Sequence, residues 1–168
     1  MYSFPINFMK WIEDNKDSLK PPVCNKVVWE NSEFIIMVVG GPNSRKDFHV
    51  DEGEEFFYQL KGSMNLKIFK DSKIEDIKIN EGEIFLLPKR IPHSPQRFKD
   101  SVGLVIERKR LDGELDGFQW YCDSCSFLLH EVYIQLSDIV AQLPIIFEEF
   151  WSDTNKRTCK NCSSLLEK

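Results

Sequence analysis

Two Cys-x-x-Cys pairs in the C-terminal part of the chain set the strongest limit on its fold. Cys122 and Cys125 form the first pair, and Cys159 and Cys162 form the second. Each spacing lets two thiolates point at one ion from a tight turn, and two such turns complete a tetrahedral four-sulfur shell. The fold must therefore return its C-terminal end to the first pair.

A shell of four sulfurs is closed, so its expected role is structural or electron-carrying. Zinc and iron both accept it, and the spacing leaves the choice open. The alternative is a set of free thiols or two disulfides. The fifth cysteine, Cys24, has no partner motif and is expected to be an ordinary thiol.

The middle of the chain consists of short β-rich runs separated by turn signals. Met64, Leu66 and Ile68 alternate with polar residues, which is the period-2 pattern of a half-buried strand. Runs at roughly ten-residue spacing without long helical patterns predict an antiparallel sandwich or barrel. The expected strands are 27–29, 34–39, 55–60, 64–69, 74–79, 84–87 and 102–108.

The two ends of the chain have a different pattern. Residues 7–15 have helical spacing, with Asn7 as N-cap. After a polar, glycine-containing stretch at 111–119, a helix is expected from Ser137 to Trp151, with a kink or restart at Pro144. The length of 168 residues suits a single domain over 1–168, with a core at about 25–110 and a metal-binding extension at about 111–168.

Composition excludes several classes of protein. The 22 Lys and Arg residues against 27 Asp and Glu residues give a net charge of −5, which argues against a nucleic-acid partner. No apolar run is long enough to cross a membrane. The first residues lack the basic and apolar regions of a signal peptide, so a cytoplasmic protein with free or metal-bound thiols is expected.

Two of the three histidines, together with one glutamate, suggest a second metal site. On neighbouring strands of a sandwich, His49, Glu55 and His93 could face one interior. Two imidazoles and one carboxylate leave positions open for substrate and O₂, an arrangement that suits non-haem iron(II). The alternative is that each histidine is a hydrogen-bonded structural residue. His130 matches no site motif.

The segments around these residues resemble the two motifs of the cupin superfamily. The residues that match are His49, Glu55 and Gly62 in the first motif and Gly82, Pro88 and His93 in the second. Asp51 stands where the second histidine of the first motif usually sits. Arg90 and Arg97 replace the glycine and asparagine of the second motif. The resemblance implies an all-β fold, a cupin or jelly-roll β-sandwich barrel with an N-terminal helix and a C-terminal helical extension that holds the four cysteines.

Longer stretches resemble the 3-hydroxyanthranilate 3,4-dioxygenase family. They are 41–49, 54–59, 92–97 and 103–110, and the cysteine quartet resembles the rubredoxin-like second iron site of the family's short microbial form. The resemblance implies cleavage of the ring of 3-hydroxyanthranilate by O₂ at an iron(II) ion, a second iron or zinc at the cysteines, and a homodimer. The product is 2-amino-3-carboxymuconate semialdehyde, which cyclises to quinolinate, the precursor of NAD.

The resemblance also implies roles for residues around the iron. Arg97 is suited to bind the substrate carboxylate, and Glu107 is expected to orient Arg97 or to carry a proton. Arg45 resembles the arginine that holds bound oxygen and its negative charge. The remaining substrate-binding candidates are the ligand Glu55 and the pocket-wall residues Asn25, Asp47 and Pro95.

Two other functions remain as alternatives. A non-catalytic cupin binding module would have no need of three metal ligands together with Arg45, Arg97 and Glu107. A different cupin enzyme, such as a thiol dioxygenase or an isomerase, typically uses three histidines, whereas only two are available here besides His130.

Overall fold

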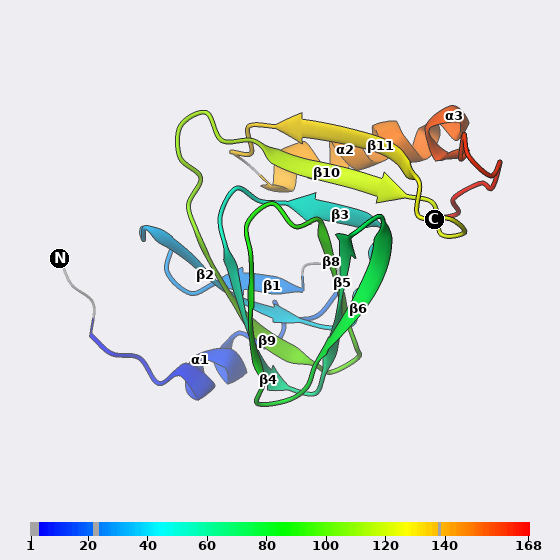
Figure 1. The fold of residues 1–168 in the computed structure, drawn as a ribbon. Coiled ribbons are helices and arrows are strands. Elements are labelled where there is room, and N and C mark those ends of the chain that lie inside the picture. The colour runs from blue at the N-terminus through cyan, green and yellow to red at the C-terminus, as the bar shows by residue number, and fades with distance from the viewer. Residues whose placement is uncertain (1–3, 22–23, 138) are drawn as a thin grey trace.

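A computed structural model describes residues 4–21, 24–137 and 139–168 of the chain. Two antiparallel sheets face each other as a sandwich (Figure 1). The five-stranded sheet has the order β1 (Asn25–Val27), β2 (Phe34–Gly40), β9 (Val102–Arg108), β4 (Glu55–Lys61) and β7 (Ile84–Leu87). The six-stranded sheet has the order β11 (Leu128–Ile134), β10 (Asp116–Tyr121), β3 (Asp47–Val50), β8 (His93–Arg97), β5 (Met64–Lys70) and β6 (Lys73–Ile79).

Most of the expected strands are confirmed within a residue or two of their predicted bounds. The run at 27–29 is displaced, because β1 covers Asn25–Val27. The alternation in β5 is confirmed, since Met64, Leu66 and Ile68 are buried. They pack with Phe57 of β4 and Val105 of β9 in the core between the sheets.

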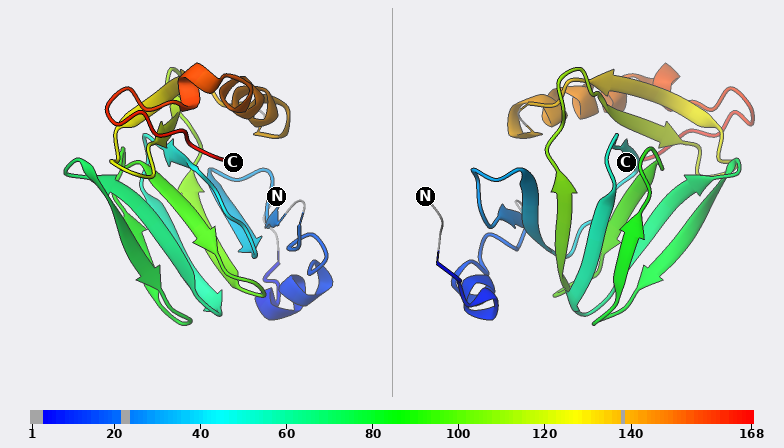
Figure 2. Two further views of the ribbon diagram at one scale, coloured as in Figure 1. Left: turned by 90° about the vertical axis from the view of Figure 1, so that its right-hand side faces the viewer. Right: turned by 60° about the vertical axis from the view of Figure 1, so that its left-hand side comes forward.

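Helices lie outside the sandwich. Helix α1 (Phe8–Asp14) begins at Asn7, whose Oδ1 accepts a hydrogen bond of 2.9 Å from the Lys10 amide, so the predicted N-cap is confirmed. Helix α2 (Ile139–Ser152) continues through Pro144 without restarting. It is followed by the short helix α3 (Thr154–Arg157). Figure 2 shows α2 and α3 at one end of the molecule and α1 at the other. No helix in the described residues has the length and apolar character that would let it span a membrane.

The sandwich continues beyond residue 110 into the C-terminal part of the chain, which also carries the expected helices and the four cysteines. Strands β10 and β11 continue the six-stranded sheet next to β3. Every residue of β10 is buried, although Asp116, Gly117 and Gln119 give its sequence the polar, glycine-containing character of a loop. Its residues Phe118 and Trp120 pack with Phe150 of α2 and with Leu166 in a second core.

Candidate metal centre and adjoining cavity

Three side chains that are distant in sequence converge between the sheets. His49 of β3 and His93 of β8 are paired across neighbouring strands of the six-stranded sheet. Glu55, the first residue of β4, reaches them from the five-stranded sheet. One ligand atom of each residue lies within 4.8 Å of the others. The predicted set of two imidazoles and one carboxylate is therefore brought together.

The hydrogen bonding of this set suits a cation. His93 Nδ1 lies 3.0 Å from the Ile91 carbonyl, and donating to it leaves the lone pair of Nε2 free. That Nε2 lies 2.7 Å from Glu55 Oε2, a buried oxygen without a hydrogen-bond partner. A nitrogen lone pair and a carboxylate oxygen that face each other in this way are the donors that a divalent metal accepts.

A carboxylate also orients His49. Asp116 of β10, which is buried, places Oδ1 2.7 Å from His49 Nε2. Phe118 stacks on the same imidazole at a centroid distance of 5.3 Å. If His49 donates its Nε2 proton to Asp116, the lone pair resides on Nδ1. Burial lowers the pKa of His49 despite the hydrogen bond that it donates to Asp116, which favours the neutral imidazole that a metal needs.

A cavity of about 250 Å³ adjoins Glu55. Five predicted residues line it: Asn25, Arg45, Glu55, Pro95 and Arg97. The rest of the wall is mainly apolar and consists of Met37, Val39, Phe57 and Val105, together with Cys24 and Asn43. Sequence reasoning gave Cys24 and Asn43 no place in this wall. Asn43 also binds Arg97, because its Oδ1 accepts a 2.7 Å hydrogen bond from the Arg97 amide.

Arg97 carries a buried charge without a counter-ion. It is 3% exposed, and its side chain donates one long hydrogen bond of 3.4 Å to Gln59. Its Nε has no partner, and within the described residues no carboxylate forms an ion pair with it. Burial lowers the pKa of Arg97 to about 10. A Cβ on Gly103 would lie 2.5 Å from the guanidinium, so glycine is needed beside it.

Arg45 and Asp47 form an ion pair beside the cavity. The backbone of Arg45 is fixed by Gln96, whose side chain accepts from the Arg45 amide at 3.1 Å and donates to its carbonyl at 3.0 Å. Asp47 is not among the residues that line the cavity. Its position differs from the predicted pocket wall, because its carboxylate contacts the Arg45 guanidinium instead.

Glu107 lies opposite Glu55 on neighbouring strands. Its ion-pair partner is Arg110, at 2.6 Å, rather than Arg97. Burial and the nearby Glu55 raise the pKa of Glu107 to about 7, against the opposing effect of Arg110. A carboxyl group with this pKa can hold or release a proton near neutral pH.

The four cysteines also converge. All four sulfurs lie within 4.8 Å of one another, with 3.5 Å between Cys122 and Cys162 and 3.6 Å between Cys125 and Cys159. None of the four forms a disulfide. Hydrogen bonds with Ser164 lower the pKa of Cys162 to about 6, whereas burial raises the pKa of Cys122 to about 11.

His130 and Cys24, which belong to no motif, lie in different parts of the fold. His130 stacks on Trp120 in the second core, at a centroid distance of 5.8 Å. It therefore does not join the other two histidines, and the set of three histidines typical of other cupin enzymes is not formed. Cys24 lies on the cavity wall.

The fold and these residues together define a cupin-like β-sandwich in which two histidines and one glutamate are grouped so that they could hold a metal ion. Residues 1–151 match the family described as 3-HAO, 3-hydroxyanthranilic acid dioxygenase, and the chain belongs to this family.

Two curated relatives are similar over nearly their whole length. The 3-hydroxyanthranilate 3,4-dioxygenase of Bacillus thuringiensis is 50% identical over 161 residues, covering 95% of this chain and 90% of the relative. The enzyme of the same name from Paraburkholderia phytofirmans is 51% identical over 162 residues, covering 96% and 93%. Among solved structures, a cupin-2 domain containing protein from Shewanella frigidimarina matches with a TM-score of 0.49 and 20% identity, over 62% of this chain and 94% of that chain.

Proposed function

We propose that this chain is a 3-hydroxyanthranilate 3,4-dioxygenase. It would cleave the aromatic ring of 3-hydroxyanthranilate and form 2-amino-3-carboxymuconate semialdehyde, the precursor of quinolinate in NAD biosynthesis. Both atoms of O₂ enter the product, so the reaction needs no external reductant. The observation that carries the proposal is a site of two histidines and one glutamate beside a cavity that holds an unpaired, buried arginine.

The donor set at His49, Glu55 and His93 fits iron(II), because imidazole and carboxylate ligands on one face leave positions open. Iron(II) bound there would bring substrate and O₂ together and allow electron density to pass from the ring to O₂. The surrounding side chains supply binding and orientation.

Arg97 supplies the charge that selects an acidic substrate. A carboxylate can accept two parallel hydrogen bonds from a guanidinium. Arg97 lines the cavity and has no ion-pair partner among the described residues, so a substrate carboxylate would supply its counter-ion. The apolar wall formed by Met37, Val39 and Val105 suits the flat ring.

Arg45 and Glu107 serve the reaction itself in this proposal. Arg45 lies on the cavity wall, held by Asp47, where a cation stabilises negative charge that develops on oxygen. Glu107, with its raised pKa, is suited to take up or return a proton near Glu55. Asn25 and Pro95 complete the wall around the substrate.

Oxygen uptake tests this function directly. We expect the iron(II)-loaded protein to consume O₂ with 3-hydroxyanthranilate and to form a yellow product. We expect His49→Ala to abolish uptake while the cysteine-bound metal remains, and His130→Ala to retain uptake, because His130 lies in the second core. Absence of uptake by the fully loaded, unmodified protein would contradict the proposal.

We also propose that the cysteine quartet holds iron or zinc as a structural ion. Two of its sulfurs follow β10, and the other two lie beyond α3. An ion bound to all four would join the two segments and leave no position for substrate.

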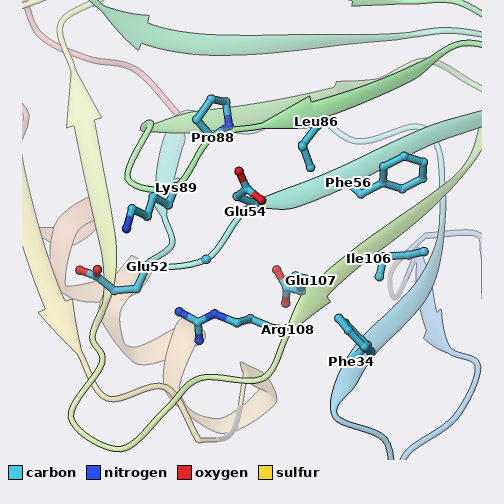
Figure 3. Close-up of a pocket in the computed structure, with 11 residues that line it drawn as sticks. Phe34, Glu52, Glu54, Phe56, Leu86, Pro88, Lys89, Ile106, Glu107 and Arg108 are labelled. Atoms are coloured by element: carbon cyan, nitrogen blue, oxygen red, sulfur yellow. The ribbon is translucent and has the colours of Figure 1, made fainter.

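We further propose that the chain forms a homodimer through the outer face of the five-stranded sheet. Phe34, Ile84 and Leu86 are 52%, 66% and 54% exposed there. Figure 3 shows Phe34, Phe56, Leu86 and Ile106 around a hollow of about 700 Å³, with both acidic and basic side chains on its other side. A surface that combines apolar groups with charges of both signs can complement a second copy of itself.

A further inference from the structure

Behind the metal centre, one guanidinium contacts three carboxylates. Arg110, with 13% of its side chain exposed, donates from Nη1 to Glu107 at 2.6 Å and from Nη2 to Asp116 at 2.6 Å. Its Nε donates to Asp116 at 3.0 Å, and Nη2 lies 3.0 Å from Asp51. These carboxylates come from different strands or connections, so Arg110 joins β9, β10 and the end of β3.

Each of these carboxylates lies next to a proposed metal ligand or to the segment that carries one. Asp116 contacts Nε2 of His49 at 2.7 Å. Glu107 lies opposite Glu55 on the neighbouring strand. Asp51 begins the connection from β3 to β4, where its Oδ1 accepts a 2.7 Å hydrogen bond from the Gly53 amide just before Glu55.

The buried charges around the metal centre also make Arg110 important. Asp51, Glu107 and Asp116 are buried together with Glu55. Buried carboxylates so close together repel unless a cation compensates them. Of the charges on Arg108 and Arg110, only that of Arg110 contacts these carboxylates, because Arg108 binds Glu114.

We propose that Arg110 is a positioning residue of the metal centre. It acts through Asp116 on His49, and through Asp51 and Glu107 on the segment that carries Glu55. The proposal rests on the metal site of the proposed function. Outer residues that orient metal ligands typically change metal affinity or activity by about 10–100-fold when mutated. Arginine suits the position because its planar fork presents five donors, whereas lysine is a single point donor.

Cobalt(II) binding in the absence of substrate tests this role. Visible absorption and chelator competition give the affinity, and subtracting the His49→Ala titration isolates the histidine site from the cysteine site. We expect Arg110→Met to weaken cobalt binding about 10–100-fold. We expect Arg110→Lys to recover part of the loss, because an ammonium group cannot hold all three carboxylates.

Arg90→Met is the matched control. Arg90 also binds a carboxylate of the β3–β4 connection, Glu52, at 2.6 Å, but it is exposed and has no contact with Asp116 or Glu107. We expect the cobalt affinity of the Arg90→Met variant to stay within about twofold of that of the unmodified protein. The positioning role is overturned if the cobalt affinity of Arg110→Met also stays within that range. It is likewise overturned if Arg90→Met loses as much cobalt affinity as Arg110→Met.

Two outcomes are separated by design. If Arg110→Met does not fold, Arg110→Lys decides, and an unchanged affinity and cobalt spectrum in this variant would overturn the proposal. If the unmodified protein consumes no O₂ with 3-hydroxyanthranilate, the proposed function fails. The cobalt measurement would still decide whether Arg110 positions the ligands.

Discussion

At the scale of single residues, Arg97 shows how a site can be maintained at a cost in stability. Burial of a charge without a counter-ion is unfavourable, and here it is strong enough to lower the pKa of Arg97 to about 10. Gly103 leaves room for the guanidinium, and Gln59 satisfies one of its donors. The positive charge of Arg97 at the cavity wall therefore remains without an ion-pair partner among the described residues.

Replacing Arg97 with methionine should separate function from stability. We expect kcat/KM for 3-hydroxyanthranilate to fall by roughly 30-fold or more, corresponding to the loss of about 2–5 kcal/mol of a buried charge-assisted contact. Thermal stability should stay equal or rise, since an apolar side chain replaces a desolvated charge. Steady-state kinetics and thermal melting check both.

Arg97→Lys serves as the conservative comparison and should lose less activity, because it retains the charge without the two parallel donors. An Arg97→Met variant with unchanged kcat/KM would exclude Arg97 from substrate binding.

Some of the proposed metal ligands could be predicted from local sequence patterns, and the family resemblance implied the complete set with His93. His49 and Glu55 are close together in the sequence, and so are the two cysteines of each pair. These short spacings do not depend on how the longer loops are arranged. Asp116 could not be predicted, because its contact with His49 spans 67 residues and depends on how β10 pairs with β3. The strand register also determines which arginine of the Arg-Lys-Arg run at 108–110 contacts the buried carboxylates, and that arginine is Arg110.

At the scale of elements, β10 connects the proposed catalytic and structural sites. It contributes Asp116 at one end, and its other end leads directly into Cys122. The sequence did not reveal this strand, because its buried polar residues Asp116 and Gln119, together with Gly117, are typical of a loop. The β10–β11 hairpin and the segment after α3 meet at the cysteine sulfurs.

Removing one sulfur should therefore loosen this end of the sandwich. At a metal concentration of 1,000 times the Kd, metal binding stabilises the folded state by about 4 kcal/mol. We expect Cys159→Ser to lose this amount from the free energy of unfolding, which corresponds to a Tm decrease of roughly 8–16 °C. Activity per filled histidine site should persist at low temperature, because the cysteine site lacks an open position.

Thermal melting with metal analysis checks this expectation, and Cys24→Ser is the control, since Cys24 lies outside the quartet. An unchanged Tm in a Cys159→Ser protein that has lost its second metal would contradict a structural role.

At the scale of the whole molecule, charge is distributed unevenly. The chain has a net charge of −5, yet Arg45 and Arg97 line the cavity and Arg110 compensates the carboxylates behind it. Net charge argued against nucleic acid but could not identify an acidic ligand, because recognition depends on the local field. Exposed apolar side chains are also distributed unevenly, since Phe34, Ile84 and Leu86 lie on the outer face of one sheet.

The proposed homodimer predicts a specific sensitivity to charge on that face. In a two-fold dimer each residue is present twice, so Ile84→Asp removes about 3–6 kcal/mol of apolar burial and should raise the dimer Kd by roughly 100-fold or more. Sedimentation equilibrium should then find a monomer at concentrations where the unmodified protein is a dimer. Ile145→Asp on α2 is the matched control, because Ile145 is 62% exposed and Ile84 is 66% exposed. A monomeric unmodified protein would refute the dimer, and dissociation by Ile145→Asp alone would place the interface on α2.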